Sequence, residues 1–353
     1  MTDSLKERHL TVSDWLSGTG PESASIISSR VRLARNIAGV RFVSRFSDED
    51  RDEIKASIRR ALPALEGMKP AEYTDIAELD NTNRTFLAER HLIGWTSARD
   101  SSDVAVAFRE DESVSIQVNE EDHVRISSIT SGLNLWGALR LAREVDRELE
   151  SFNAPAFDER IGYLTACPTN VGTGMRASLL VHLPGLVLTR EIGKVINGVS
   201  QIGLAVRGFR GEGSNFIGNL FQVSNQTTLG LAEEDIVETV ERIVAQLLQY
   251  ELKAKEVLVK DAKLQIDDKI WRALGILENS RLLGSTECAA LSSAVRLGVD
   301  LGILTQEYIP TLNKLLMMVQ PAHIQKRTNA ELEIEERDYL RATLVRTWLR
   351  SMK

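Results

Sequence analysis

The sequence contains few residues of the kinds that stabilise secreted proteins or anchor proteins in membranes. Its 353 residues include only two cysteines, Cys167 and Cys288, which are too few for a disulfide framework and are typical of a reducing compartment. No apolar run approaches the roughly 20 residues that cross a bilayer, and the N-terminus lacks the apolar segment of a signal peptide. No cysteine or histidine cluster has the spacing of zinc ligands. We therefore expect a cytoplasmic protein without a membrane segment.

Basic residues are outnumbered by acidic ones, so the composition does not favour nucleic-acid binding. There are 43 lysines and arginines against 50 aspartates and glutamates, and the net charge is −7. Between Ser28 and Ser47, however, there are five arginines, no lysine and no acid. Arg30 and Arg32 alternate with the period of a strand and should point to the same side. This cluster predicts a local anion site.

A second informative segment runs from Cys167 to Ser178 and reads Cys-Pro-Thr-Asn-Val-Gly-Thr-Gly-Met-Arg-Ala-Ser. A thiol near hydrogen-bond donors and positive charge can be held as the reactive thiolate. Gly172 and Gly174 would let the backbone approach an anion closely, and Arg176 can bind two phosphate oxygens at once. These features suit the handling of a phosphoryl group. The alternative interpretation is a buried structural cysteine before an ordinary turn.

Two further segments combine carboxylates with arginine. Residues 119–125, Asn-Glu-Glu-Asp-His-Val-Arg, follow a strand-like run, and such acid clusters are candidates for a general base or a cation-binding group. Residues 207–215, Arg-Gly-Phe-Arg-Gly-Glu-Gly-Ser-Asn, place two arginines and a carboxylate in a glycine-rich loop.

In chain order, four stretches, 28–32 (Ser-Ser-Arg-Val-Arg), 119–125, 167–178 and 207–212, resemble the ATP:guanidino phosphotransferases, the family of arginine and creatine kinases. Ser224-Asn225 and Leu229-Gly230 follow the last of them, and the resemblance spans residues 28–258. It implies transfer of a phosphoryl group from ATP to a guanidino group.

The resemblance assigns roles to individual residues. It implies an ATP site that includes Ser28, Ser29, Arg30, Val31, Arg32, His91, Arg125, Arg176, Ala177, Ser178, Leu179, Leu180, Arg207, Gly208, Phe209, Arg210, Gly211 and Glu212. It implies a catalytic set of Glu121, Cys167 and Glu212, in which the two carboxylates hold the acceptor guanidinium and Cys167 orients it as a thiolate. A guanidinium has no nucleophilic lone pair, so a base must take its proton, and Glu121 is favoured over Glu212 for this step. A packing role remains the alternative for His91.

The cofactors implied are ATP and Mg²⁺. The metal would be held chiefly by phosphates and waters, with no direct protein ligand and with Glu120 as a candidate for a water-mediated contact.

The departures from the small-molecule kinases indicate a particular branch. Those enzymes place a long helical domain before the arginine-rich strand, whereas 27 residues precede Ser28 here, so a larger acceptor is expected. The family's Tyr-Asp-Ile-Ser-Asn is replaced by Phe-Gln-Val-Ser-Asn at 221–225, and residues 259–353 are added. In these features the chain resembles the bacterial protein-arginine kinases. That resemblance implies protein substrates, the ClpC–ClpP protease, the CtsR repressor and the McsA activator as partners, and a dimer or higher oligomer.

The C-terminal segment contains a second motif. Arg337, Asp338, Tyr339, Leu340, Arg341 and Ala342 resemble the Arg-Asp-x-x-Arg-Ala element with which protein-arginine kinases bind phosphoarginine allosterically. Arg337 and Arg341 lie one helical turn apart and could bind the phosphate, with Asp338 on the guanidino group. Composition alone would equally suit an ordinary solvated helix.

The expected fold is α+β. Val104 to Arg109 and Ser113 to Val118 should form paired strands, Ser47 should cap a helix through about Leu62, and helical patterns dominate after Glu233. We predict an N-terminal arm (1–27), a catalytic domain on an antiparallel sheet (28–258) and a helical regulatory domain (259–353). Besides a protein-arginine kinase, a small-guanidino phosphagen kinase and a catalytically silent phosphoarginine-binding adaptor remain as alternatives.

Overall fold

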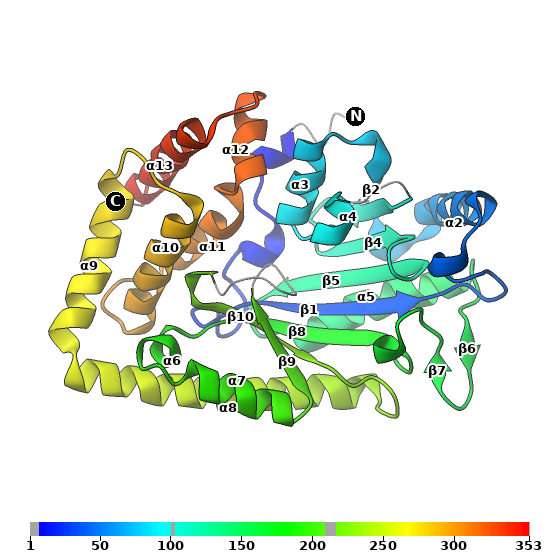
Figure 1. Ribbon diagram of the computed structural model, residues 1–353, viewed down its shortest axis with the longest axis horizontal. Helices are drawn as coiled ribbons and strands as arrows, with labels where there is room; N and C mark the ends of the chain where they lie inside the picture. The colour runs from blue at the N-terminus through cyan, green and yellow to red at the C-terminus, as the bar shows by residue number, and fades with distance from the viewer. Residues whose placement is uncertain (1–6, 100–102, 209–216, 353) are drawn as a thin grey trace.

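The computed structural model describes residues 7–99, 103–208 and 217–352. Its centre is an eight-stranded antiparallel sheet in the order β2-β3-β4-β5-β1-β8-β10-β9 (Figure 1). The strands are β1 (Ile26–Arg35), β2 (Ala71–Asp75), β3 (Ala105–Arg109), β4 (Val114–Val118), β5 (Val124–Ser131), β8 (Met175–His182), β9 (Leu204–Gly208) and β10 (Leu220–Asn225). A separate two-stranded sheet consists of β6 (Phe157–Asp158) and β7 (Gly162–Tyr163).

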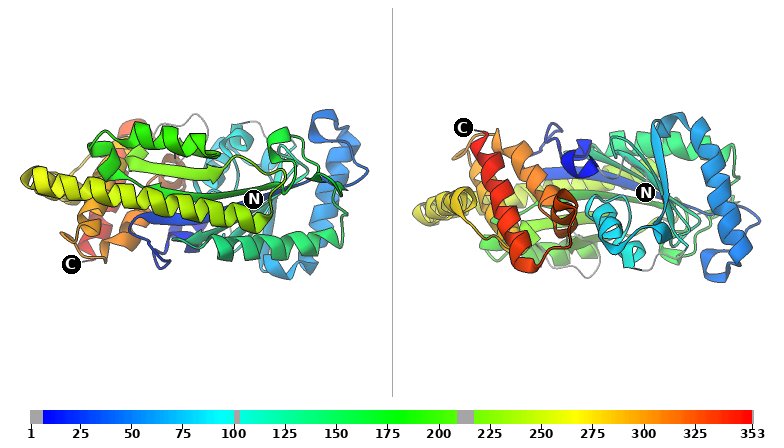
Figure 2. Two further views of the ribbon diagram at one scale, coloured as in Figure 1. Left: turned by 90° about the horizontal axis from the view of Figure 1, so that it is seen from below. Right: turned by 90° about the horizontal axis from the view of Figure 1, so that it is seen from above.

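Three helices cover one face of this sheet. They are α5 (Leu135–Glu150), which packs on β1 and β5, α8 (Glu233–Asp261), which packs on β8 and β10, and α7 (Ile192–Gln201), which packs on β9. Seen from below, α8 runs between α7 and α5 along the length of the sheet (Figure 2). The other helices before α8 are α2 (Asp48–Ala61), α3 (Asn81–Glu89), α4 (Trp95–Arg99) and α6 (Pro184–Leu188).

Strand alternation gives β1 two different faces. Val31 and Leu33 are fully buried in the main hydrophobic core, together with residues of α5 and α8. Arg30 and Arg32 alternate with them and are only partly buried. Because successive side chains of a strand point to opposite faces, the two arginines project from the face that α5 and α8 do not cover. The prediction that they share one side is confirmed.

Local sequence signals account for several elements. Ser47 caps α2 as predicted: its hydroxyl accepts from the Asp50 backbone at 3.3 Å, and its own backbone N–H donates to the Asp50 carboxylate at 2.9 Å. Ile54 and Ile58, one turn apart on α2, are buried against the sheet. Strands β3 and β4 pair antiparallel, as expected from their alternation.

The C-terminal helices form a second group at one end of the sheet, on the left in Figure 1. They are α9 (Lys263–Asn279), α10 (Ser285–Asp300), α11 (Tyr308–Met318), α12 (Pro321–Thr328) and α13 (Ile334–Arg350), and they share their own hydrophobic core. The helix α8 extends to Asp261, and the non-helical backbone of Ala262 separates it from α9. The α+β fold class is confirmed. The domain limits stay a prediction, although the chain does form two distinct hydrophobic cores.

The segment before β1 lies between the two groups. Trp15 and Leu16 are buried with Met317 and Met318 of α11 in a small core of their own. Arg8 forms ion pairs with Glu72 and, at 3.1 Å, with Glu112. The segment therefore connects the sheet to the C-terminal helices.

Candidate active site

A cleft with a volume of about 680 Å³ opens on the face of the sheet opposite α5 and α8. Residues of β1, β5, β8, β9 and β10 line it, as do residues near His91 and Cys167. Five arginines that the sequence assigned to a phosphate site belong to this lining, namely Arg30, Arg32, Arg125, Arg176 and Arg207. The fold therefore brings together residues that are separated by up to 177 positions in the chain, from 30 to 207.

Strand register sets two of these arginines side by side. Arg32 on β1 lies directly opposite Arg176 on β8. Like charges that lie directly opposite each other destabilise a sheet. The repulsion between these two arginines must therefore be offset by other groups of the protein or by a bound anion. Burial and the nearby guanidinium groups of Arg30, Arg125 and Arg176 hold the pKa of Arg32 well below its usual value. Arg32 Nε is buried, with no hydrogen-bond partner among the described residues.

The pKa of Arg30 is also lowered, to about 10, by burial and by Arg125. Arg30 Nε donates to Ser127 Oγ at 2.9 Å, and its Nη2 donates to the backbone oxygen of His91 at 3.3 Å. The Arg30 guanidinium therefore still carries its charge at neutral pH. Concentrated positive charge with a buried unused donor fits a polyphosphate anion.

The arginine-rich segment as a whole is not an anion site. Arg35, on the same strand as Arg32, lies on the helical side and forms an ion pair with Asp146 of α5, with Nη2 to Oδ2 at 2.7 Å. Arg41 forms an exposed ion pair with Asp50 at 2.7 Å. The prediction from composition was therefore too broad, because alternation along β1 sends Arg35 away from the cleft.

Acidic residues border the arginine cluster. The two Nη atoms of Arg125 contact Glu120 at 2.6 Å and Glu121 at 2.7 Å. The Glu121 side chain is 42% exposed, and Asn170 Nδ2 donates to it at 3.5 Å. Glu121 is therefore accessible to a cationic acceptor next to the place where phosphates would bind.

Cys167 lies in the cleft lining and is only partly buried, so the interpretation as a buried structural cysteine does not describe it. Its sulfur is 3.0 Å from the hydroxyl of Thr169, and the Thr165 hydroxyl donates to its backbone oxygen at 2.7 Å. Cys288, by contrast, is buried in the C-terminal core, where burial raises its pKa to about 11.

Two residues that the sequence analysis did not assign hold the Cys167 segment in position. Asp122 Oδ1 accepts from the Ala166 backbone at 2.7 Å and from Asn36 Nδ2 at 2.7 Å. Burial raises the pKa of Asp122, although these two hydrogen bonds oppose the shift. Asp122 thereby connects the acidic turn, the end of β1 and the cysteine segment. Its place within the acidic motif was the available signal, but nothing in the sequence indicated Asn36 as its partner.

The two glycines after Cys167 have a different role from the one predicted. Both have positive φ, 110° for Gly172 and 63° for Gly174. A Cβ at Gly172 would lie 2.6 Å from the backbone oxygen of Thr228, and one at Gly174 would lie 2.5 Å from that of Ala34. They therefore permit close approach to the protein's own backbone rather than, as we expected, to an anion.

The remaining predicted ATP-site residues separate into three groups. Ser28, His91, Ser178 and Leu180 line a small cavity with Trp15 and Arg30 beside the cleft. Three others, Val31, Ala177 and Leu179, are fully buried in the main core, so their side chains do not line the cleft. Gly208 is the last residue of β9, whereas Phe209, Arg210, Gly211 and Glu212 lie outside the described residues.

Ser29 and His91 also make packing interactions. The Ser29 hydroxyl donates to the Gly132 backbone oxygen and accepts from the Asn134 backbone, both at 2.7 Å, which connects β1 to the start of α5. The His91 backbone has a positive φ of 61°, and its ring packs edge-on against Trp15 at 5.4 Å. His91 lines the cleft as well, so both of its predicted roles remain open.

The C-terminal motif lies on α13, and its two arginines differ in exposure. Arg341 is 2% exposed; it donates to the backbone oxygens of Val319 at 2.9 Å and Leu283 at 2.8 Å and contacts Asp338. Arg337 is partly exposed and donates to the Leu332 backbone oxygen at 3.1 Å. Of the two residues predicted to bind phosphate, Arg337 is thus the accessible one. Tyr339 is exposed, Leu340 is partly buried and Ala342 is in the core.

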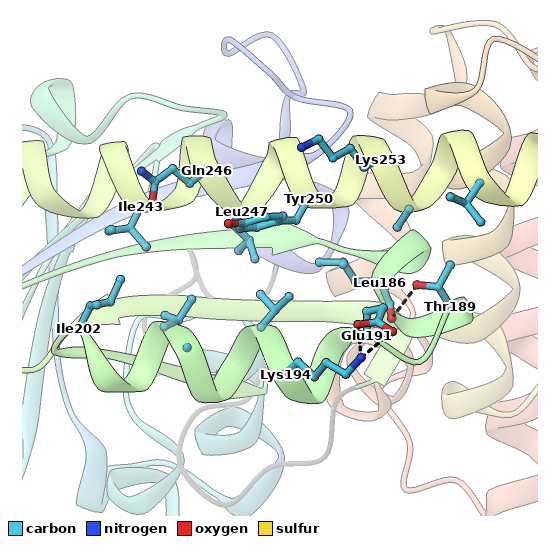
Figure 3. Close-up of a pocket in the computed structure, with 15 residues that line it drawn as sticks. Leu186, Thr189, Glu191, Lys194, Ile202, Ile243, Gln246, Leu247, Tyr250 and Lys253 are labelled. Atoms are coloured by element: carbon cyan, nitrogen blue, oxygen red, sulfur yellow. Dashed lines mark hydrogen bonds and ion pairs between the residues drawn. The ribbon is translucent and has the colours of Figure 1, made fainter.

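A larger cavity, about 780 Å³, lies away from this site, between α7 and α8 (Figure 3). Its lining is mostly aliphatic, with Tyr250 beside Leu247 on α8 and Lys194 on α7 in the close-up. The four sequence motifs contribute no residue to its lining, so the size of a cavity does not by itself indicate the site that the motifs predict.

Family comparisons agree with the geometry of the cleft. Residues 53–254 match the model of the ATP:guanido phosphotransferase C-terminal catalytic domain, and residues 263–353 match that of the protein-arginine kinase McsB C-terminal domain. Among solved structures, the duplicated taurocyamine kinase from Schistosoma mansoni with transition-state analogue components aligns with a TM-score of 0.59 and 27% identity, over 67% of this chain and 34% of that one. Lombricine kinase aligns with a TM-score of 0.57 and 24% identity, over 70% and 75% of the two chains, and supports the fold alone.

The chain belongs to the ATP:guanido phosphotransferase family. Within that family, it is 46% identical over 341 residues to the protein-arginine kinase of Geobacillus kaustophilus (strain HTA426), a match that covers 96% of this chain and 94% of the relative. It is 42% identical over 344 residues to the protein-arginine kinase of Bacillus cereus (strain AH187), with 97% of both chains covered. These matches group it with the protein-arginine kinases and confirm the family predicted from the four motifs.

Proposed function

We propose that this chain is an ATP-dependent protein-arginine kinase, which transfers the γ-phosphoryl group of ATP to arginine side chains of proteins. The observation that carries the proposal is the cleft, where an arginine cluster suited to phosphates adjoins an accessible carboxylate and a cysteine suited to a guanidinium. The nearly full-length similarity to relatives named protein-arginine kinase supports a protein acceptor.

The arginines would position the nucleotide and compensate its charge. Phosphoryl transfer passes through a loose transition state, so catalysis depends mainly on alignment and on stabilising negative charge on oxygen. Arg32 has a buried Nε available for such an oxygen, and Arg176 lies opposite it. A bound polyphosphate would remove the repulsion between these two guanidinium groups.

Magnesium is expected with the nucleotide, where it would neutralise phosphate charge. Among the described residues, no three His, Cys, Asp or Glu side chains are grouped so that they could hold a metal ion. Mg²⁺ usually keeps several waters and binds substrate phosphates, so we expect it to be held mainly by phosphate oxygens and water. Glu120, whose carboxylate is already paired with Arg125 at 2.6 Å, would contribute through a water.

Glu121 would act on the acceptor. Its carboxylate can accept the proton that the guanidinium loses as nitrogen attacks phosphorus, and Asn170 and Arg125 hold it in position. Cys167 would lie against the guanidinium and favour its orientation. Glu212, outside the described residues, is the proposed second carboxylate.

We also propose that α13 binds phosphoarginine at a regulatory site. Arg337 would contact the phosphate and Asp338 the guanidino group, while Arg341 would hold Asp338 from within the domain. Titration calorimetry on the full chain would test this proposal. Arg337→Ala should weaken phosphoarginine binding without lowering the melting temperature. An unchanged affinity for phosphoarginine would mean that α13 is an ordinary solvated helix.

The finer functional context follows from similarity to the family. We propose that phosphorylated proteins are passed to a ClpC–ClpP protease, that CtsR and McsA are partners, and that the enzyme works as a dimer or higher oligomer in the cytoplasm. Among the described residues, no helix is long and apolar enough to span a membrane.

The decisive experiment supplies Mg-ATP with an unfolded arginine-containing protein and, in parallel, with free arginine. Acid-labile phosphate is then mapped by mass spectrometry. Phosphate on protein arginines is the expected result. Label on free arginine alone would favour the small-guanidino kinase, and no label with retained phosphoarginine binding would favour the silent adaptor.

A further inference from the structure

A second pocket of about 490 Å³ opens directly from the catalytic cleft. Four residues line both the cleft and this pocket, namely Thr96, Glu120, Glu121 and Arg125. The pocket therefore begins at Glu121, the carboxylate proposed to act on the acceptor. Its remaining lining residues come from the segment before α2, from α2 and α4, from the two residues before β3 and from the β4–β5 turn; they are Val43, Phe46, Arg51, Ser97, Asp103, Val104 and Asn119.

Two buried polar groups of this lining have no hydrogen-bond partner in the part of the chain that the structure describes. Asn119 and Ser97 are each 2% exposed, and Asn119 Oδ1 and Ser97 Oγ make no hydrogen bond among the described residues. The position of the Asn119 amide is fixed, because its Nδ2 donates to the Arg51 backbone oxygen at 3.1 Å. Its backbone also adopts a positive φ of 59° in the β4–β5 turn. Buried polar atoms without partners are uncommon and costly, so both atoms require an explanation.

Ser97 and Glu120 both lie beside Gly94. A Cβ built on Gly94 would be 3.8 Å from Ser97 Oγ and 3.9 Å from Glu120 Oε1. Its hydroxyl can donate or accept, and Asn119 Oδ1 can only accept. A ligand that satisfies both must offer a donor to Asn119 and a polar atom of either kind to Ser97. A peptide group, with its N–H and C=O, has this combination.

The charged residues of the pocket argue against other occupants. Arg51 is paired with Asp103 at 3.3 Å, and Arg125 with Glu120 and Glu121. Three carboxylates against two guanidinium groups leave one negative charge in excess, which disfavours a nucleotide or another phosphate. Among the described residues, no three His, Cys, Asp or Glu side chains are grouped so that they could hold a divalent cation here. Phe46 and Val43 add an apolar surface for one uncharged side chain.

We propose that this pocket is the binding site for the substrate polypeptide beside its acceptor arginine. The proposal rests on the proposed protein-arginine kinase activity and adds a place for the chain that carries the guanidino group. Asn119 Oδ1 accepts from a main-chain N–H of the substrate, Ser97 Oγ bonds a neighbouring peptide group, and an uncharged flanking side chain packs on Phe46. Recognition of main-chain atoms selects arginine within a polypeptide over free arginine and requires little of the surrounding sequence.

The test compares the full-length chain with its Ser97→Ala and Asn119→Gly variants. Glycine tolerates the positive φ at position 119, so the turn should be retained. The ligand is a fluorescent nonapeptide with one central arginine and otherwise uncharged residues. Each variant should weaken peptide binding and raise the KM for peptide about fivefold, the size expected for one lost neutral hydrogen bond. The KM for ATP should stay unchanged in both variants.

Ser292→Ala is the matched control. Ser292 is 5% exposed on α10, and its hydroxyl also has no hydrogen-bond partner among the described residues, but it lies outside both the cleft and this pocket. This variant should bind peptide and ATP like the wild type. If Asn119→Gly does not fold, Ser97→Ala and a third variant, Val43→Glu, still test the pocket, because the new carboxylate would occupy its apolar side.

The outcomes separate this proposal from the proposed function. Phosphorylation of protein arginines with unchanged peptide affinity in Ser97→Ala and Val43→Glu would overturn the pocket assignment and leave the kinase intact. Peptide binding that these variants weaken, in a chain that phosphorylates no arginine, would retain the pocket and refute the kinase. Parallel increases in the KM for ATP would indicate a general disturbance and would overturn the pocket assignment too.

Discussion

Arg32 and Arg35 lie three residues apart on β1 and illustrate two opposite uses of arginine. Arg35 faces the helices, where Asp146 binds it at 2.7 Å, the backbone oxygens of Ala34 and Thr173 accept from it, and the ring of Tyr163 lies 3.5 Å from its guanidinium. Arg32 faces the cleft, opposite Arg176, with a buried Nε that has no partner among the described residues. The first arginine stabilises the protein, and we propose that the second binds a ligand.

The same contrast extends across the molecule. Arg90 and Arg341 are also buried, and both are surrounded by oxygen atoms of the protein. Arg90 contacts Glu112 at 2.6 Å and donates to the backbone oxygens of Arg8 and Thr11. Buried guanidinium groups away from the cleft, such as these two, thus have matched acceptors, whereas burial and neighbouring guanidinium groups lower the pKa of Arg30 and Arg32 in the cleft. Accumulated like charge, rather than the number of arginines, distinguishes the candidate phosphate site.

The largest expected effect is the loss of turnover on replacement of Glu121, the acid that pairs with Arg125 in the cleft. Glu121→Gln keeps the shape and the contact with Arg125 but removes the proposed base, so turnover should fall by about a thousandfold, within the usual range for general-base catalysis. ATP affinity, measured by equilibrium titration, should change little. Glu120→Gln provides the comparison and should lose much less turnover. A loss of ATP affinity as large as the loss of rate would mean that Glu121 serves Arg125 rather than the acceptor.

A substitution of Arg35, on the face of β1 that packs against the helices, should lower the stability of the fold. Arg35→Ala leaves Asp146 buried without its cation, and breaking such a pair typically costs about 3 kcal/mol or more. Urea denaturation would measure this loss. If Arg32→Ala destabilised the chain equally, the distinction between the two faces would be wrong, because removing Arg32 should relieve repulsion and leave the free energy of unfolding unchanged or higher.

Substitutions of the arginines that face the cleft should lower catalytic efficiency. The variants Arg32→Lys and Arg176→Lys keep the charge but lose the planar guanidinium, which can donate two hydrogen bonds to one phosphate. In each variant, kcat/KM for ATP should therefore fall between about tenfold and a hundredfold. Melting temperatures should stay near that of the wild type. Steady-state kinetics unchanged in both variants would remove this pair from the phosphate site.

The sequence predicted the parts of the site that depend on local pattern or on recognised motifs. Alternation along β1 gave the shared side of Arg30 and Arg32, and the motifs gave Glu121 and Cys167. The direct opposition of Arg32 and Arg176 could not be predicted, since the register of β1 and β8 depends on pairing across more than a hundred residues.

Burial and partner choice were the other properties that local pattern could not supply. Helical spacing placed Arg337 and Arg341 on one side of α13, yet the packing of α13 against its neighbours buries Arg341. Asn36 and Asp122 come together because the end of β1 meets the acidic turn. These contacts depend on the tertiary fold, as does the difference between Arg32 and Arg35.

The smallest expected effect concerns an acid at the junction of the two groups of helices. Glu251 on α8 is fully buried and accepts from the backbone of Gly185 at 2.7 Å and Leu186 at 2.9 Å, and the next turn of α8 carries Lys255, which binds Asp300 of α10. Burial raises the pKa of Glu251 to about 7. The folded chain therefore holds this proton more tightly than the unfolded chain, so stability falls as pH rises from about 4.5 to 7.

Between pH 6 and 7, the wild type should lose about 1 kcal/mol of unfolding free energy relative to Glu251→Gln, because each unit of pKa difference corresponds to about 1.4 kcal/mol. Glutamine cannot ionise and keeps one of the two acceptors, which makes it the suitable reference. Urea denaturation at both pH values would measure the difference, and Glu256→Gln, at an exposed position of the same helix, should follow the wild type. If the unfolding free energies of all three proteins changed in parallel, Glu251 would be ionised throughout this range. The charge of its buried carboxylate would then have to be fully compensated by the start of α6 and by Lys255, as Asp146 compensates the charge of Arg35.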